Sequence, residues 1–187
     1  MLEPWPIYSK QDEDSVLKVL RSGKVNYWTG SETKQFEKEF AEYIGSKYSV
    51  ALANGSLALS AAYISLGIQE GDEVITTPRT FIATASTIAL LKATPIFADV
   101  DKDSGLITAK SIEPLITPKT KAISVVHLGG WPAEMDLICK LAKDYNIKVL
   151  EDCSQSHGSE LNGQKVGTFG EVATWSFCQD KTITTAG

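Results

Sequence analysis

The chain has 187 residues, of which 43% are hydrophobic and 22% are charged, and its net charge is −5. This is the composition of a globular protein with one substantial core, and the lack of a lysine- and arginine-rich block excludes nucleic acid as the main partner. No apolar stretch approaches the length of a membrane span, and residues 1–8 lack the basic and apolar regions of a signal peptide, so we expect no membrane partner. The three cysteines lack metal-binding spacing, which favours reduced thiols in a cytoplasmic protein without a metal site.

The first part of the chain has two helical patterns. Apolar residues recur at helical spacing over residues 10–21 and again over residues 32–44, with a loop at residues 26–30 between them. We therefore expect an N-terminal helical arm of about residues 1–45, followed by an α/β core of about residues 46–187.

Beyond the arm, short apolar runs alternate with helical patterns. The runs are apolar throughout, as expected for strands that are covered on both faces. This alternation predicts a three-layer α/β/α sandwich with a mainly parallel sheet. A small hairpin is predicted over residues 160–166, with Asn162-Gly163 at its turn. The predicted strands are 48–53, 72–77, 95–100, 121–127, 147–151 and 172–175, and the predicted helices are 56–66, 81–92 and 132–145.

Polar and aromatic residues follow five of the predicted strands. In an open α/β sheet, ligands bind outside the carboxyl ends of the strands, so these residues would meet at one edge. Glu151 is expected to point to the opposite face of its strand from Asp152. The residues at the predicted strand ends are Asn54, residues 77–81, His127, Asp152 and Ser176.

The segment Asn54-Gly55-Ser56-Leu57 joins a predicted strand to a predicted helix. Free amides at a helix N-terminus bind phosphate, and the Ser56 hydroxyl can add a hydrogen bond. The alternative is an ordinary capping turn, which is common. Phe81 also allows two interpretations, because its ring can lie flat on a cofactor ring or pack in the core at the base of a helix.

A carboxylate at the end of one strand and a lysine beyond the next are the pair that pyridoxal 5'-phosphate (PLP) requires. The carboxylate of Asp152 would keep the pyridine nitrogen protonated, and the amine of Lys181 would form a Schiff base with the aldehyde. Gln155 would bond the phenolic oxygen, and Ser176 would give a second hydroxyl to the phosphate. A solvated surface position is the alternative for Lys181. His157 is equally compatible with a structural role and with a contact in the site.

Ordered segments over nearly the whole chain resemble the DegT/DnrJ/EryC1/StrS sugar aminotransferases. The segments include Tyr27-Trp28-Thr29-Gly30, Asn54-Gly55-Ser56, Gly71-Asp72-Glu73-Val74-Ile75, Thr80-Phe81-Ile82-Ala83-Thr84-Ala85, Pro132-Ala133-Glu134-Met135-Asp136, Glu151-Asp152 to His157-Gly158, and Ser176-Phe177 to Lys181. Members of that family are PLP enzymes of fold type I. The resemblance implies that this chain forms the large, PLP-binding domain of that fold.

The resemblance also implies roles for individual residues. Lys181 matches the Schiff-base lysine that moves the proton, so it is the predicted catalytic residue. Independently of the resemblance, its aromatic character and its position in the early loop make Trp28 a candidate for the sugar or nucleotide pocket, and His157 is a second candidate for a substrate contact. The predicted cofactor-binding residues are Gly55, Ser56, Leu57, Phe81, Asp152, Gln155, Ser176 and Lys181.

Members of the family transfer an amino group from glutamate to a keto group of a nucleotide-linked sugar by a ping-pong mechanism. Relatives with histidine in place of the lysine are dehydratases, so Lys181 favours transamination. The implied pathways make surface polysaccharide, lipopolysaccharide or related amino sugars, and the implied assembly of the full-length protein is a homodimer.

Family members continue well beyond this lysine into a smaller C-terminal domain. We therefore expect an N-terminal portion without that domain, with little or no turnover by itself. The alternative is a catalytically inactive lookalike that binds PLP or a partner. A dinucleotide-binding domain ranks last, because no GxGxxG lies between the first strand and the first helix of the core.

Overall fold

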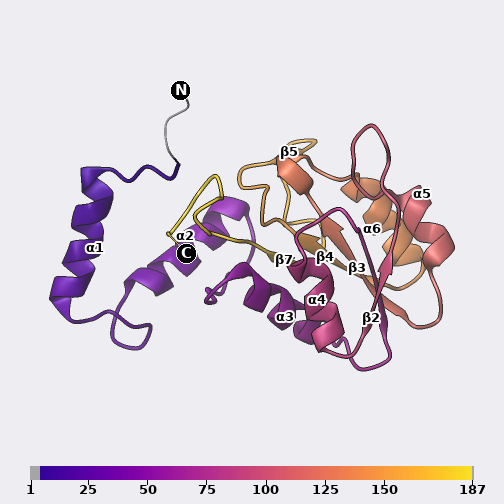
Figure 1. The fold of residues 1–187 in the computed structure, drawn as a ribbon, viewed down its shortest axis with the longest axis horizontal. Helices are drawn as coiled ribbons and strands as arrows, with labels where there is room; N and C mark the ends of the chain where they lie inside the picture. Colours follow the sequence, from indigo (N-terminus) through magenta and orange to yellow (C-terminus); the bar gives the residue numbers. More distant parts are fainter. Residues whose placement is uncertain (1–4, 187) are drawn as a thin grey trace.

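The centre of the molecule is a sheet of five parallel strands (Figure 1). The structure, a computed structural model, describes residues 5–186. The strand order is β2-β1-β3-β4-β7, so β1 pairs with both β2 and β3. All five carboxyl ends consequently lie along one edge of the sheet. The strands are β1 (Glu73–Thr76), β2 (Thr94–Phe97), β3 (Thr120–Val126), β4 (Lys148–Asp152) and β7 (Val172–Thr174).

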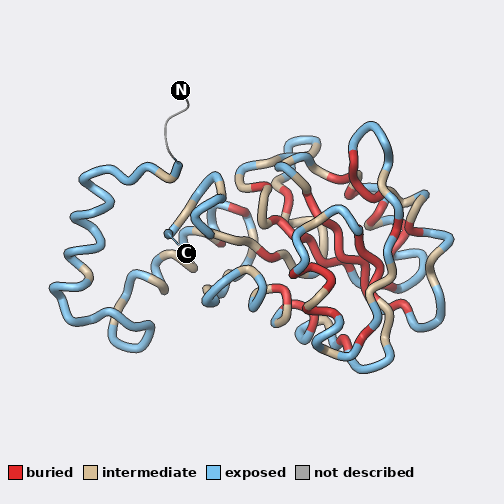
Figure 2. Tube along the Cα trace, in the orientation of Figure 1, coloured by how far each residue is buried: buried red, intermediate tan, exposed pale blue. Residues whose placement is uncertain are grey.

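Helices cover both faces of this sheet, which confirms the predicted three layers. Buried apolar side chains form two clusters, because successive side chains of a strand point to opposite faces. Figure 2 shows the buried residues concentrated along the strands and on the helix surfaces that face them. One cluster joins the sheet to α5 (Ala109–Ile112) and α6 (Met135–Asp144), and the other joins it to α3 (Gly55–Ser65) and α4 (Ala83–Leu90).

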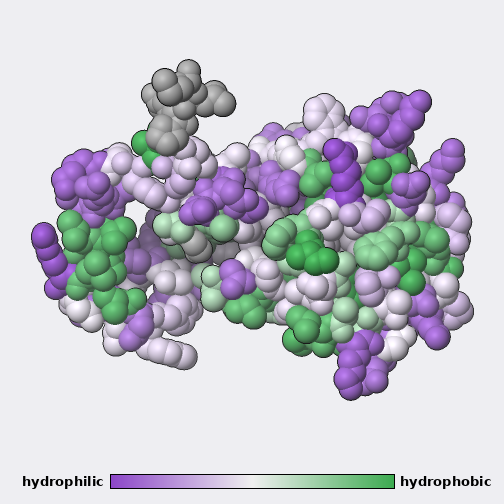
Figure 3. Space-filling view, viewed as in Figure 1, coloured by the Kyte–Doolittle hydropathy of each residue, from purple (hydrophilic) through white to green (hydrophobic). Residues whose placement is uncertain are grey.

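Two helices precede the sheet and extend to one side of it (Figure 1). Helix α1 (Lys10–Ser22) begins with a capping box at Ser9, a pattern that satisfies free amides at the first turn. It has no buried residue, and Figure 3 shows apolar side chains grouped on its surface. Helix α2 (Glu32–Ile44) has the bounds that its apolar spacing predicts, and it contributes buried residues.

The predicted strand at residues 48–53 is wrong. These residues are irregular in the structure, although they are apolar enough for a strand. Their polar contacts go to α2, because the Ser49 hydroxyl donates to the carbonyl of Glu37 and the amide of Ala51 donates to the Glu37 Oε1 at 2.8 Å. The segment therefore lies against a helix and is paired with no strand among the described residues.

The short elements show what the sequence pattern does and does not reveal. The predicted hairpin is confirmed as β5 (Glu160–Leu161) and β6 (Gln164–Lys165), with Asn162 and Gly163 both at positive φ in the turn. The 3₁₀ turns η1 (Glu113–Leu115) and η2 (Leu128–Gly130), and α5, were not predicted, since one helical turn is too short for periodicity. Within residues 5–186, none of the helices is both long and apolar enough to cross a bilayer.

Candidate functional site

Asp152 ends β4 and is a buried carboxylate with a fixed direction. It is 4% exposed, its Oδ2 accepts a hydrogen bond from the Thr84 hydroxyl at 2.8 Å, and its Oδ1 accepts one from the Ser154 amide at 3.1 Å. Because Thr84 lies in the first turn of α4, this contact ties the end of β4 to that helix. Each carboxylate oxygen has room for a further donor. The group can therefore accept a hydrogen bond from a ligand at this edge.

The start of α3 and the residue after β7 approach each other closely. A side chain on Gly55 would place its Cβ 3.1 Å from the Cβ and 3.5 Å from the hydroxyl oxygen of Ser176. Asn54 caps the helix by accepting from the Leu57 amide at 2.9 Å. The first amides of a helix have no partner within it, so those of Gly55 and Ser56 remain for another acceptor. The structure thus brings together the residues predicted to hold a phosphate, with the Leu57 amide already bonded to the cap.

Lys181 lies beyond β7, in the segment that follows Ser176. Its side chain is 15% exposed, and its amine pairs with the Asp180 carboxylate at 3.0 Å. The backbone amide of Lys181 donates to the carbonyl of Cys178 at 3.0 Å, so the residue sits in a turn. Asp180 itself is largely exposed, and such ion pairs contribute little free energy. The amine is therefore held by a weak contact that it can exchange for another.

Phe81 and Gln155 belong to the segments that also supply the partners of Asp152: Phe81 precedes Thr84, and Gln155 follows Ser154. Phe81 precedes α4, its carbonyl accepts from the Thr84 amide at 3.2 Å, and its side chain is 65% exposed rather than packed in the core. Gln155 has its Oε1 bonded to the Gly129 amide at 2.9 Å, which leaves the amide nitrogen of its side chain for a ligand. The exposed ring and the free donor are compatible with the predicted contacts.

The two candidate substrate residues lie in very different surroundings. Trp28 is in the loop between α1 and α2, it is 86% exposed, and its ring meets the ring of Tyr27 edge to face. The loop between α1 and α2 lies to one side, away from the sheet (Figure 1). His157 is packed between the rings of Trp175 and Phe177, at centroid distances of 5.3 and 5.1 Å.

The surroundings of His157 favour its neutral form. Neither ring nitrogen has a hydrogen-bond partner among the described residues. Burial lowers the pKa of His157, the backbone of Ser176 opposes this, and the positive charge of Lys181 lowers it further. A neutral imidazole between two aromatic rings supports a packing role more than a contact with an open substrate pocket.

Glu151 forms a buried hydrogen-bond centre whose partners sequence reasoning missed. The Ala133 amide donates to Nδ1 of His127 at 3.1 Å, so the ring proton is on Nε2, which donates to the Glu151 Oε2 at 3.1 Å. Burial acts to raise the pKa of Glu151, but the bonds from His127 and from nearby amides outweigh it and lower that pKa. Three backbone amides donate to the carboxylate at 2.8 Å, those of Gly167, Phe169 and Gly170.

This centre fixes the loop that leads into β7. Its signal in the sequence was the adjacent pair of carboxylates, which predicts opposite directions for Glu151 and Asp152 but not the partners of either. The structure confirms the opposite directions, since Asp152 bonds α4 and Glu151 bonds the loop before β7. The position of Ser176 and Lys181 therefore depends on a buried anion on the other face of the sheet.

A cleft of about 1160 Å³ lies between α2, α3 and β7. Gly55 and Ser176 line it, whereas Asp152 and Lys181 do not. The cleft therefore meets the group of predicted site residues only at its phosphate end. Since the chemistry predicted here needs a carboxylate and an amine, the hydrogen-bonded edge around Asp152 defines the site better than this cleft.

A model of the DegT/DnrJ/EryC1/StrS aminotransferase family matches residues 6–187. The chain belongs to this family. It is 46% identical to the GDP-perosamine synthase of Escherichia coli O157:H7 over 156 residues, and this alignment covers 83% of this chain and 43% of that protein. The aminotransferase from Psychrobacter cryohalolentis has a TM-score of 0.98 and 52% identity, and covers 100% of this chain and 47% of that one. The PLP form of the putative sugar aminotransferase Spr1654 from Streptococcus pneumoniae has a TM-score of 0.91 and 29% identity, and the match covers 98% of this chain and 51% of that one.

Two facts follow for a member of the DegT/DnrJ/EryC1/StrS family. The fold is that of its PLP-dependent relatives, as the sequence predicted. The chain spans about half the length of the relatives that it matches.

The residues present fit the cofactor of the family. A buried carboxylate suits a protonated pyridine nitrogen, and the place that a side chain on Gly55 would fill beside Ser176 suits a phosphate. The exposed ring of Phe81 suits a planar ring, and the weakly held amine of Lys181 suits an aldehyde.

Proposed function

We propose that this chain is the cofactor-binding part of a PLP-dependent aminotransferase, which moves an amino group from glutamate to a keto group of a nucleotide-linked sugar. The product would enter surface polysaccharide, lipopolysaccharide or related amino-sugar biosynthesis. One observation carries the proposal: a buried carboxylate, Asp152, ends β4, while Ser176 follows β7 beside Gly55 at the start of α3 and is itself followed by the segment that holds Lys181. The name of the related GDP-perosamine synthase supports the sugar substrate.

Asp152 is the residue proposed to hold the pyridine ring. As a carboxylate it accepts a hydrogen bond from a protonated ring nitrogen, and the Thr84 hydroxyl keeps its second oxygen oriented. When bound, PLP supplies an electron sink for the carbanion at the substrate carbon. The role of Asp152 is to keep that nitrogen protonated, and its burial strengthens the ionic contact.

Five other residues are proposed to hold the remaining parts of the cofactor. The amides of Gly55 and Ser56, at the positive end of α3, bind the phosphate together with the Ser176 hydroxyl. Phe81 stacks on the ring. The free side-chain nitrogen of Gln155 donates to the phenolic oxygen, because its Oε1 is already bonded to the loop after β3.

Lys181 is proposed as the catalytic residue. Its amine would hold the aldehyde of the cofactor, and once free it would act as the base that takes the proton from the substrate carbon. Both roles require that Lys181 leave Asp180, and the exposure of that carboxylate makes the separation inexpensive.

The glutamate donor, the sugar acceptor and a homodimeric assembly of the whole protein belong to this proposal. The relatives are about twice as long as the region that they share with this chain, so groups outside it can contribute to substrate binding. A second outcome is a PLP-binding protein without turnover. Incubating the whole protein with glutamate and nucleotide-linked keto sugars, and detecting the amino sugar by mass spectrometry, distinguishes the two.

The cofactor assignment can be tested on the chain itself. PLP is added, the visible spectrum is recorded, and borohydride reduction is followed by peptide mass mapping. We expect the label at Lys181, and none there in Lys181→Arg, which keeps the charge but removes the nucleophile. Lys165→Arg is the matched control, since that lysine lies on the hairpin strand β6. A label spread over many lysines in the parent chain would refute the assignment.

A further inference from the structure

Lys181 lies in a closed loop whose base is Phe177. The Thr185 amide donates to the Phe177 carbonyl oxygen at 2.9 Å, and within the loop the Lys181 amide donates to the carbonyl of Cys178 at 3.0 Å. We call residues 177–185 the lysine loop. Because the loop is closed by its own backbone, its placement relative to the sheet depends on how Phe177 is held.

Two rings of α2 contact the side chain of Phe177, on which His157 also packs. Its ring centroid lies 5.3 Å from that of Phe36 and 5.4 Å from that of Phe40, with interplanar angles of 85° and 77°. These are edge-to-face contacts, a preferred arrangement of aromatic pairs. Phe40 also meets Trp175 edge to face at 5.4 Å, so the residues on either side of Ser176 both pack on α2.

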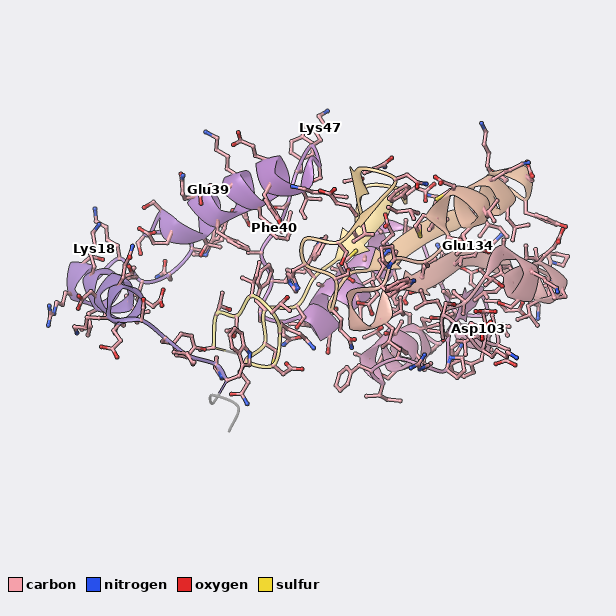
Figure 4. All side chains as sticks on the ribbon, turned by 90° about the horizontal axis from the view of Figure 1, so that it is seen from above. Lys18, Glu39, Phe40, Lys47, Asp103 and Glu134 are labelled. Atoms are coloured by element: carbon pink, nitrogen blue, oxygen red, sulfur yellow. The ribbon has the colours of Figure 1, made fainter. Side chains whose placement is uncertain are left out.

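The sequence of α2 produces this contact. Phe36 and Phe40 are four residues apart, so they share one face of the helix and stack on each other at 5.5 Å. Figure 4 shows Phe40 on the side of α2 turned toward the C-terminal segment and Glu39 on the other side. Glu37 binds the amide of Ala51 in the segment that leads into α3. Helix α2 is therefore attached both to the lysine loop and to the approach to the proposed phosphate site.

We propose that α2 positions the lysine loop, with Phe36 and Phe40 as the positioning residues for Lys181. The inference rests on the proposed function, in which the Lys181 amine binds PLP. The two rings act through Phe177, which is the fixed end of the loop. Asp152 is held separately, by α4. Loss of the ring contacts should therefore displace the amine and leave the carboxylate in place.

This arrangement gives α2 a role beyond core packing. A helix that contributed only core packing would stabilise the whole chain, and the loss of its ring contacts would loosen the sheet and the lysine loop together. A positioning helix has a local effect, because the other contacts of the loop are limited: among the described residues its amine pairs only with the exposed Asp180, and the one aromatic ring outside α2 that meets Phe177 is that of His157, at 5.1 Å. The two roles can thus be separated by where the structure loosens.

The test uses Phe36→Leu and Phe40→Leu, singly and combined. Leucine keeps most of the apolar volume but removes the edge-to-face geometry. The matched control is Phe97→Leu, because Phe97 is 49% exposed on β2, at the far edge of the sheet from β7. Two quantities are measured: amide hydrogen exchange in the lysine loop, and the share of the borohydride-trapped PLP label found at Lys181.

We expect exchange in the lysine loop to be about tenfold faster in the double variant, with the protection of β3 and β4 unchanged. The share of label at Lys181 should fall about fivefold, because a small displacement of a reacting group strongly lowers its reactivity. The single variants should show smaller changes in the same direction, and they decide the question if the double variant loses its fold. Phe97→Leu should match the parent in both measurements.

Unchanged exchange in the lysine loop of every folded variant would overturn the proposal. Equally faster amide exchange in the lysine loop and across the sheet would also overturn the proposal, since α2 would then stabilise the whole chain rather than the loop alone. If the parent chain itself takes the label at many lysines, the proposed PLP role of Lys181 fails. The exchange measurement still decides in that case whether α2 holds the loop, so the two failures are distinguishable.

Discussion

The buried carboxylate of Glu151 offers the sharpest test of what holds this site together. Its Oε1 accepts from the amides of Phe169 and Gly170, and its Oε2 accepts from the Gly167 amide and from His127. Glu151→Ala removes all four acceptor contacts. Glu151→Gln keeps one oxygen and turns an NH₂ group toward the donors on the other side, so it removes about half of them.

The magnitude follows from the donors left without an acceptor. Each costs about 1–3 kcal/mol, and the loop amides are only partly buried, so values at the low end of that range apply. We expect the free energy of unfolding to fall by about 2 kcal/mol in Glu151→Gln and by about 4 kcal/mol in Glu151→Ala. The second value is a large share of the roughly 5–15 kcal/mol that stabilises a domain.

The pKa direction supplies a second check. The lowered pKa of Glu151 means that its contribution is present above the ordinary value of 4.5 and is lost as the pH falls through the folded-state value. The difference between the parent and Glu151→Gln should therefore shrink below pH 4.5. Urea unfolding followed by circular dichroism measures both effects. Glu160→Gln is the control, because Glu160 is exposed on β5. Equal losses in the two glutamine variants would refute the reasoning.

Three further predictions concern the predicted site residues. Asp152→Asn keeps the geometry but removes the charge, and we expect about tenfold weaker PLP binding by fluorescence titration with an unchanged circular dichroism spectrum. Gly55→Val places a side chain against Ser176, so PLP affinity should fall by a similar factor, about tenfold, while binding unaffected by the substitution would contradict a phosphate site there. The lowered pKa of His157 means that stability is full above the ordinary value of 6.5 and is lost as the pH falls through the folded-state value. His157→Asn should remove this part of the pH dependence of the free energy of unfolding, measured in urea. A pH profile identical to that of the parent would exclude a contribution from His157.

The fold could be predicted where a segment supplies its own signal. Helix α2 has the predicted bounds because its apolar period is regular, and the hairpin formed because Asn162 and Gly163 both tolerate positive φ. The prediction of a strand at residues 48–53 was wrong for the opposite reason. An apolar run becomes a strand only with a partner, and the amide of Ala51 instead bonds a glutamate side chain of α2. Local pattern does not determine pairing.

The candidate site also has a part that the sequence reveals and a part that it does not. Residues at strand ends, such as Asp152 and Ser176, could be predicted because parallel strands share one carboxyl edge. The contacts that orient them could not be predicted, because Thr84 and Asp152, like Phe40 and Phe177, are far apart in the sequence and no local pattern links them. Trp28 was a candidate by aromatic character and loop position, and in the structure it is exposed in the loop between α1 and α2.

The two adjacent carboxylates of β4 explain why the register of this strand matters. Successive side chains point to opposite faces, so Asp152 meets α4 while Glu151 meets the loop before β7. A shift of one residue would turn every side chain of the strand to the opposite face, so Asp152 would leave the side of α4 and Glu151 would leave the side of the loop amides. The five paired positions between β3 and β4 oppose that shift. The same strand thus supplies the proposed partner of the pyridine nitrogen and, one residue earlier, the anion that fixes the path of the chain toward Lys181.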